Sequence, residues 1–160
     1  MSNLVVIRFK SEDQAAQVLD EVADLQKQNL IKIDDAATVI RNAAGKVKTS
    51  QANNLVGAGA MGGAFWGMLF GLLFFVPFLG LAIGAASGAL AGKASDYGIN
   101  DDFIKKVSRS IQPGNSALFL LVEHAQVDKI IEHLKPFKGE IIHTSLSEKE
   151  ETKLKEAFAA

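Results

Sequence analysis

The longest feature of this sequence is a run without charge: the 44 residues between Lys48 and Lys93 contain no Asp, Glu, Lys or Arg. Glycines inside the run recur every fourth residue on both sides of Pro77. Four residues make about one helical turn, so each series lines one helix face and leaves it without side chains. Glycine costs about 1 kcal/mol relative to alanine inside a helix, so the two series favour close helix packing. The run is predicted to form a helical hairpin with glycine ladders Gly59, Gly63, Gly67 and Gly71, and Gly80, Gly84, Gly88 and Gly92, and with its turn at Pro77.

This hairpin has the composition of a membrane segment. Spanning a bilayer takes about 20 apolar residues, which 55–75 supplies, whereas 78–92 is shorter. The tip is wholly apolar, so two fits stay open: two full spans, or a wedge that turns inside the bilayer. A soluble alternative would need a protein shell that the rest of the chain hardly supplies, unless a large oligomer buries its hairpins together. The aromatic residues that such a shell would have to cover are Phe65, Trp66, Phe70, Phe74, Phe75 and Phe78.

Charged residues are confined to the two flanks of the run. Residues 1–48 hold seven basic and seven acidic side chains, and residues 93–160 hold ten basic and eleven acidic. This balance provides no concentrated basic face of the kind that nucleic-acid binding needs. The absence of cysteine excludes disulfides and thiolate metal sites.

The flanks are expected on the cytoplasmic side of a membrane. The first apolar stretch, Leu4 to Ile7, is short and ends at Arg8, which does not fit a signal peptide. A two-helix hairpin returns the chain to the side it left. Lysines precede and follow the uncharged run but are absent from its turn, in agreement with the positive-inside rule.

The flanks read as an α+β domain that the hairpin interrupts. Strands are predicted at 3–9, 31–41, 46–51, 117–123 and 140–144, and helices at 11–29, from Asn100 to Ile111, at 127–137 and after Ser147. The chain is predicted to consist of three parts. Residues 1–51 form the first half of the α+β domain with its β-hairpin, residues 52–97 form the hydrophobic hairpin, and residues 98–160 form the short amphipathic helix, the second half of the domain and a last helix. Without the insertion the order is strand, helix, strand, twice over, which is the ferredoxin-like pattern with the two most apolar strands in the centre.

In this pattern one face of the sheet needs a further cover. Right-handed crossovers place both long helices on the same face. A partner subunit or the short helix from Asn100 would cover the other face. That helix alternatively lies along the membrane surface, because Lys105, Lys106 and Arg109 stand opposite its apolar stripe. The last helix has only Leu154 and Phe158 as apolar contacts, which predicts loose docking or contact with a neighbouring subunit.

Three phrases of the second half carry a family resemblance. They are DDFIKKV, PGNSALFLLVEH and GEIIHTSLS, and they follow the glycine-rich segment. In this order the chain resembles, over nearly its whole length, the bacterial family of predicted membrane proteins catalogued as domain of unknown function 1269. The resemblance implies a bacterial membrane protein and carries no catalytic residue with it.

Candidate chemical sites in the sequence are weak. Residues 57–62 match GxGxxG, but a polar strand precedes them and no acidic residue follows at the spacing that ribose binding needs. Asp34 and Asp35 are the only adjacent acidic pair near a strand and are interpreted as its solvated start. His124, His133 and His143 have no metal-ligand spacing. We therefore assign no catalytic, cofactor-binding or metal residue.

The sequence as a whole favours a non-enzymatic integral membrane protein of the bacterial inner membrane, with both termini cytoplasmic. Its partners would be membrane lipid and further copies of the chain, packed through Gly63, Gly67, Gly84 and Gly88 in particular, without nucleic acid or an identified small-molecule substrate. A structural, stress-related or pore-like role follows from that picture. The alternative is a soluble or peripheral oligomeric ligand-sensing module whose hairpins are buried between subunits.

Overall fold

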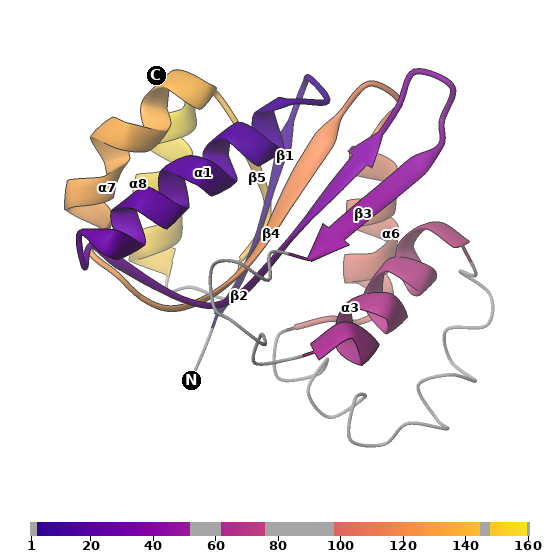
Figure 1. Cartoon of the computed structure of the whole chain (residues 1–160), viewed down its shortest axis with the longest axis horizontal. Helices are drawn as coiled ribbons and strands as arrows, with labels where there is room; N and C mark the ends of the chain where they lie inside the picture. The colour runs from indigo at the N-terminus through magenta and orange to yellow at the C-terminus, as the bar shows by residue number, and fades with distance from the viewer. Residues whose placement is uncertain (1–2, 52–61, 76–97, 145–147, 160) are drawn as a thin grey trace.

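The computed structural model describes residues 3–51, 62–75, 98–144 and 148–159. These residues form one five-stranded sheet with helices on both of its faces (Figure 1). In chain order the elements are β1 (Asn3–Phe9), α1 (Gln14–Lys27), β2 (Ile31–Arg41), β3 (Val47–Gln51), α3 (Gly62–Phe70), η1 (Gly71–Phe75), α6 (Asp101–Ser110), β4 (Ser116–Ala125), α7 (Val127–Leu134), η2 (Lys135–Phe137), β5 (Glu140–Thr144) and α8 (Glu148–Ala159). The predicted α+β class is confirmed.

The strand order is β3-β2-β4-β1-β5, and the paired strands are antiparallel. β4 and β1 are inner neighbours because their side chains are apolar on both faces. Along β4, Leu118 and Leu120 join the core on one face of the sheet, while Phe119 and Leu121 join the core on the other. This alternation is the period of two that a strand imposes on a doubly covered sheet.

The first face of the sheet is covered by α1, α7 and α8. Val18, Val22 and Leu25 recur along one side of α1 and are buried there against the strands. As predicted, α1 and α7 lie on the same face. The prediction of loose docking for α8 is wrong, because Leu154 and Phe158 are both buried in this core.

The second face is covered by α6 and by the described part of the uncharged run. Phe103 and Val107 of α6 pack in one core with Leu4 and Val6 of β1, and Figure 1 shows α3 beside α6 on this side of the sheet. Of the alternatives left open for α6, packing on the sheet is the one that the structure shows. The chain itself provides this cover, without a partner subunit.

The local chemistry of α6 accounts for its two ends. The Asn100 side chain accepts a hydrogen bond from the Phe103 N–H at 2.9 Å, which is the predicted N-cap. At the other end, Arg8 Nη1 donates to the Ser110 carbonyl at 3.1 Å, and Arg41 Nη1 donates to the Ile111 carbonyl at 2.9 Å. Guanidinium groups from β1 and β2 thus satisfy carbonyls at the negative end of the helix and hold it on the sheet.

The uncharged run is helical throughout the part that is described. Residues 62–75 consist of the nine-residue α3 followed directly by the π-helical turn η1, and the earlier residues of the predicted helix, 55–61, lie outside the described ranges. Among the residues that the structure describes, no helix combines the length and the apolarity needed to cross a bilayer. The expectation that the chain hardly supplies a shell for its aromatic residues is wrong for Phe65, Trp66 and Phe70, because the second face of the sheet buries all three. Phe74 is half-buried against the same core, and Phe78 lies outside the described residues.

Candidate functional site

The inner face of α3 is an aromatic anchor on the sheet. Trp66 stacks on Phe70 with ring centroids 5.7 Å apart, and both rings meet Phe119 of β4 edge-on, at 6.4 Å for Trp66 and 5.2 Å for Phe70. Such pairs contribute about 0.5–1.5 kcal/mol each beyond their burial. Leu69 and Leu73 are buried in the same cluster. The helix is therefore fixed to the middle of the sheet by one of its sides.

One polar atom of this anchor has no partner. Trp66 is 3% exposed, and its indole Nε1 makes no hydrogen bond within the structure as described. A buried donor of this kind costs about 1–3 kcal/mol. Apolar contact rather than hydrogen bonding accordingly holds α3 in place.

The outer face of α3 has a different character. Gly67 is exposed, and a Cβ built on it meets no atom within 4 Å. Gly71 and Leu72 are half-buried, and α3 and η1 contain no charged residue. A surface helix normally carries polar side chains on the side away from its core. This outer face, centred on Gly67 and Gly71, lacks them and is the candidate functional surface.

The predicted glycine ladders are described only in part. Gly63 and Gly67 lie in α3 and Gly71 begins η1, whereas Gly59, Pro77, Gly80, Gly84, Gly88 and Gly92 lie outside the described residues. Gly67 lies on the side of the helix that faces away from the sheet. No described helix packs against it at close range.

α6 lies next to η1 and adds charge to the same side of the molecule. Phe103 and Val107 are buried toward the sheet, while Lys105, Lys106 and Arg109 are exposed. Lys105 and Arg109 are four residues apart and so share one stripe on the outside of the helix. The sequence had placed these three cations opposite the apolar stripe, and the structure does the same.

The acidic pair of β2 is arranged differently from its prediction. The interpretation as a solvated strand start is wrong for Asp35, which is 0% exposed and accepts a hydrogen bond from the Ala36 N–H at 2.9 Å. Asp35 is buried because β2 lies beside β4 in a sheet that is covered on both faces. The register with β4 shifts on both sides of Ile33, so the pairing steps over Glu123 and Asp34, and Asp35 pairs with Leu121. Such a shift cannot be read from residue alternation.

Asp34 belongs to a small polar cluster across two strands. Burial raises the pKa of the Asp34 carboxyl, and a hydrogen bond with Glu123 acts in the same direction. Lys32 Nζ, 3.0 Å from Glu123 Oε2, lowers the pKa of Glu123. Sequence reasoning missed this cluster because it joins β2 to β4, and only their register brings the three side chains together. Glu123 is largely exposed, so the cluster is a solvent-facing network.

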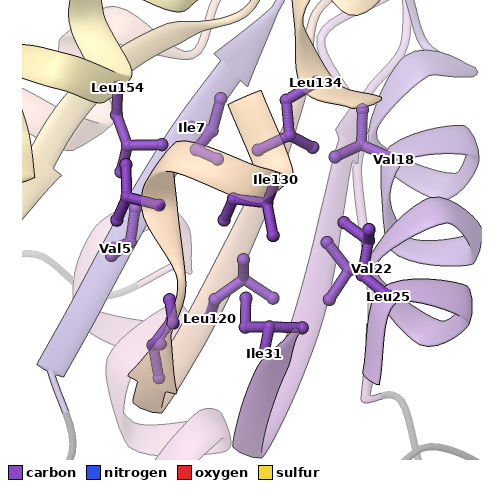
Figure 2. Close-up of a pocket in the computed structure, with 13 residues that line it drawn as sticks. Val5, Ile7, Val18, Val22, Leu25, Ile31, Leu120, Ile130, Leu134 and Leu154 are labelled. Atoms are coloured by element: carbon purple, nitrogen blue, oxygen red, sulfur yellow. The ribbon is translucent and has the colours of Figure 1, made fainter. Parts of the chain in front are cut away.

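The first core contains a cavity of about 30 Å³ between the sheet and α1, α7 and α8 (Figure 2). Its lining is apolar throughout, and Figure 2 shows Val5, Val22, Leu120 and Ile130 among the side chains around it. The volume suffices for one water molecule, but a buried water needs two to four polar partners. This cavity is therefore a dry packing defect and not a ligand site.

The three histidines do not converge. His133 Nδ1 lies 3.0 Å from Glu21 Oε1, the His143 ring lies edge-on to Phe103 at 4.6 Å, and His124 is exposed at the end of β4. In the described ranges there is no group of three His, Asp or Glu side chains able to hold a metal ion. The GxGxxG match lies outside these ranges, apart from Gly62 at the start of α3.

Comparison with protein families identifies the family of this chain but assigns no activity to it. The family model described as "Protein of unknown function (DUF1269)" matches residues 60–159. The chain belongs to the DUF1269 family. The match takes in α3, η1, α6, β4, α7, η2, β5 and α8, and so includes the candidate surface. Comparison of this DUF1269 chain with curated proteins and with solved structures finds no match.

Proposed function

We propose that this protein is a non-enzymatic membrane protein in which the uncharged run contacts lipid and the sheet domain holds it at the bilayer surface. The observation that carries this is the outer face of α3 and η1, where Gly67, Gly71 and Leu72 offer water no polar side chain although none of them belongs to a core cluster. Hydrocarbon does not form hydrogen bonds, so exposing an apolar helix face to lipid carries no free-energy penalty of the kind that exposure to water does. The lysines that flank the run favour a cytoplasmic position for the sheet domain at a bacterial inner membrane.

We further propose that copies of the chain associate through the glycine ladders, as a glycine zipper. The exposed position of Gly67 supports this, because its backbone is open to close approach by another helix. Gly63, Gly67, Gly84 and Gly88 are the residues on which we place the contact. The role that follows is structural or stress-related, or pore-like, at the membrane.

The fold name that we propose is ferredoxin-like. Its support is the order β2-β4-β1-β5 of the four main strands, antiparallel throughout, together with α1 and α7 as the two crossover helices on one face. β3 and α8 are additions to that plan. A ferredoxin-like plan does not imply an activity, because it carries many unrelated functions.

The test of the association uses leucine on an outer helix face. Gly67→Leu places a large side chain where close helix packing needs none, and we expect a smaller oligomer by light scattering in detergent. Gln17→Leu is the matched control, because Gln17 is exposed on α1 on the opposite side of the sheet. An oligomer of unchanged size in Gly67→Leu would rule out the glycine contact.

A second candidate function is a peripheral oligomer whose uncharged segments are buried between subunits. The burial of Phe65, Trp66 and Phe70 on the sheet of the same chain favours it, because aromatic anchors are already covered without lipid. Membrane extraction separates the two candidates. Retention in the membrane after alkaline carbonate supports the membrane protein, and release of the wild-type chain supports the peripheral oligomer.

A further inference from the structure

The two faces of the sheet differ in charge. On the first face, α1, α7 and α8 contain nine acidic residues and five Lys or Arg residues. On the second face, α6 contains three basic and two acidic residues, and α3 and η1 contribute none. The net charge of the whole chain, -1, conceals this asymmetry.

The cations of the second face are also available for contact. Lys105, Lys106 and Arg109 are exposed, and within the described ranges none of them forms an ion pair. On the first face two of the five lysines and one histidine are paired with carboxylates, whereas Lys27, Lys129 and Lys149 are exposed and form no ion pair within the described ranges. Lys153 lies 2.9 Å from Asp128, Lys155 lies 2.7 Å from Glu151, and His133 lies 3.0 Å from Glu21.

The basic stripe of α6 and the uncharged outer face of α3 form one surface. α6 contacts η1, and both helices pack on the same side of the sheet, so the sides that they turn away from it point in the same direction. We infer that this surface docks on a bilayer of anionic phospholipid: Lys105, Lys106 and Arg109 contact headgroup phosphates while Gly67 and Gly71 meet the apolar boundary. The inference rests on the proposed membrane function and adds the orientation and the lipid class.

A bilayer fits both halves of the surface better than other partners do. A nucleic acid would neutralise the cations but would leave the uncharged helix without a matching surface. The acidic face of a second copy is partly neutralised by its own lysines. An anionic bilayer supplies phosphate to the stripe and hydrocarbon to the uncharged face, which is the arrangement that interfacial helices use.

Vesicle binding tests the inference with purified full-length protein. Flotation is measured with vesicles of phosphatidylcholine alone and with vesicles of phosphatidylcholine and phosphatidylglycerol in equal parts, at low and high salt. The variant carries Lys105→Gln, Lys106→Gln and Arg109→Gln. The matched control removes three exposed lysines without ion pairs from the first face, by Lys27→Gln, Lys129→Gln and Lys149→Gln, for the same change in net charge. Circular dichroism verifies that both variants are folded.

We expect the wild-type chain to prefer the anionic vesicles, by a margin that shrinks in high salt. A cation near an anionic surface contributes about 1 kcal/mol, so the α6 variant should lose about 100-fold in binding to these vesicles while its binding to neutral ones is unchanged. The control variant should keep the preference.

Other outcomes overturn the inference in distinguishable ways. Equal wild-type binding to both kinds of vesicle, or equal losses in the two variants, would refute the lipid class and the orientation but leave the proposed function standing. Failure of the wild-type chain to bind either kind would refute the proposed function as well. Salt-sensitive self-association, or binding to a short DNA duplex, that is lost only in the α6 variant would assign the stripe to another partner.

Discussion

Leu69→Ala tests whether α3 belongs to the core of the protein. Leu69 is 0% exposed and packs in the second core with the aromatic anchor. Removing a buried leucine side chain costs about 2–5 kcal/mol, because apolar area is lost and a cavity remains. For full burial on the sheet we expect about 3 kcal/mol, which lowers the Tm by about 6–12 °C in a chain of this size.

The chain provides its own control and its own reporter for this test. Leu72 lies one turn farther on, is half-buried and takes no part in either core cluster, so Leu72→Ala should lower the free energy of unfolding by about 1 kcal/mol or less. The sequence contains a single tryptophan, Trp66, which is buried beside the site. Its fluorescence during urea unfolding without lipid therefore follows α3 directly.

The contrast between the two leucines decides the result. If α3 left the sheet and made its contacts elsewhere, both substitutions would have small and similar effects. Equal effects of Leu69→Ala and Leu72→Ala, or a tryptophan emission that is already solvent-exposed in the folded protein, would refute the packing of α3 on the sheet.

Three further predictions concern single positions. Gly67→Ala should raise the free energy of unfolding by about 1 kcal/mol, since its Cβ enters open space in a helix; a loss of stability in urea would contradict this. Glu123→Gln should lower the pKa of Asp34 in an NMR titration, while burial keeps it above its ordinary value. Lys153→Met should raise the pKa of Asp128, which a hydrogen bond to Lys153 lowers. The stabilising effect of that bond is present above the ordinary carboxyl pKa and is lost as pH falls through the lowered one, so the variant should lack this acid sensitivity.

The strands and most of the helices could be predicted because their signals are local. The apolar runs around Val5 and Phe119 became the inner strands, the stripe of α1 became its buried face, and Asn100 became an N-cap. Each of these signals depends on residues that are close together in the sequence. Tertiary contacts then strengthened these preferences without changing them.

The position of α3 could not be predicted in the same way. A helix that is apolar on all sides suits lipid, an oligomer interface or a protein core equally well, and only the partner surface decides between them. Here the partner surface is the second face of the sheet, where Leu4, Val6 and Phe119 come from distant parts of the sequence. The candidate site was accordingly half predictable: the glycines and cations were identified, but not the aromatic anchor that orients them.

The central claim is that the outer face of α3 touches lipid, and one fluorescence measurement tests it most directly. The chain has no cysteine, so Gly67→Cys provides a single position for an environment-sensitive label, and Lys27→Cys on the exposed side of α1 provides its counterpart. On addition of vesicles containing phosphatidylglycerol, we predict a blue shift and a stronger emission for the label at position 67, with no change at position 27. Unchanged emission at position 67, or the same shift at both positions, would contradict the claim.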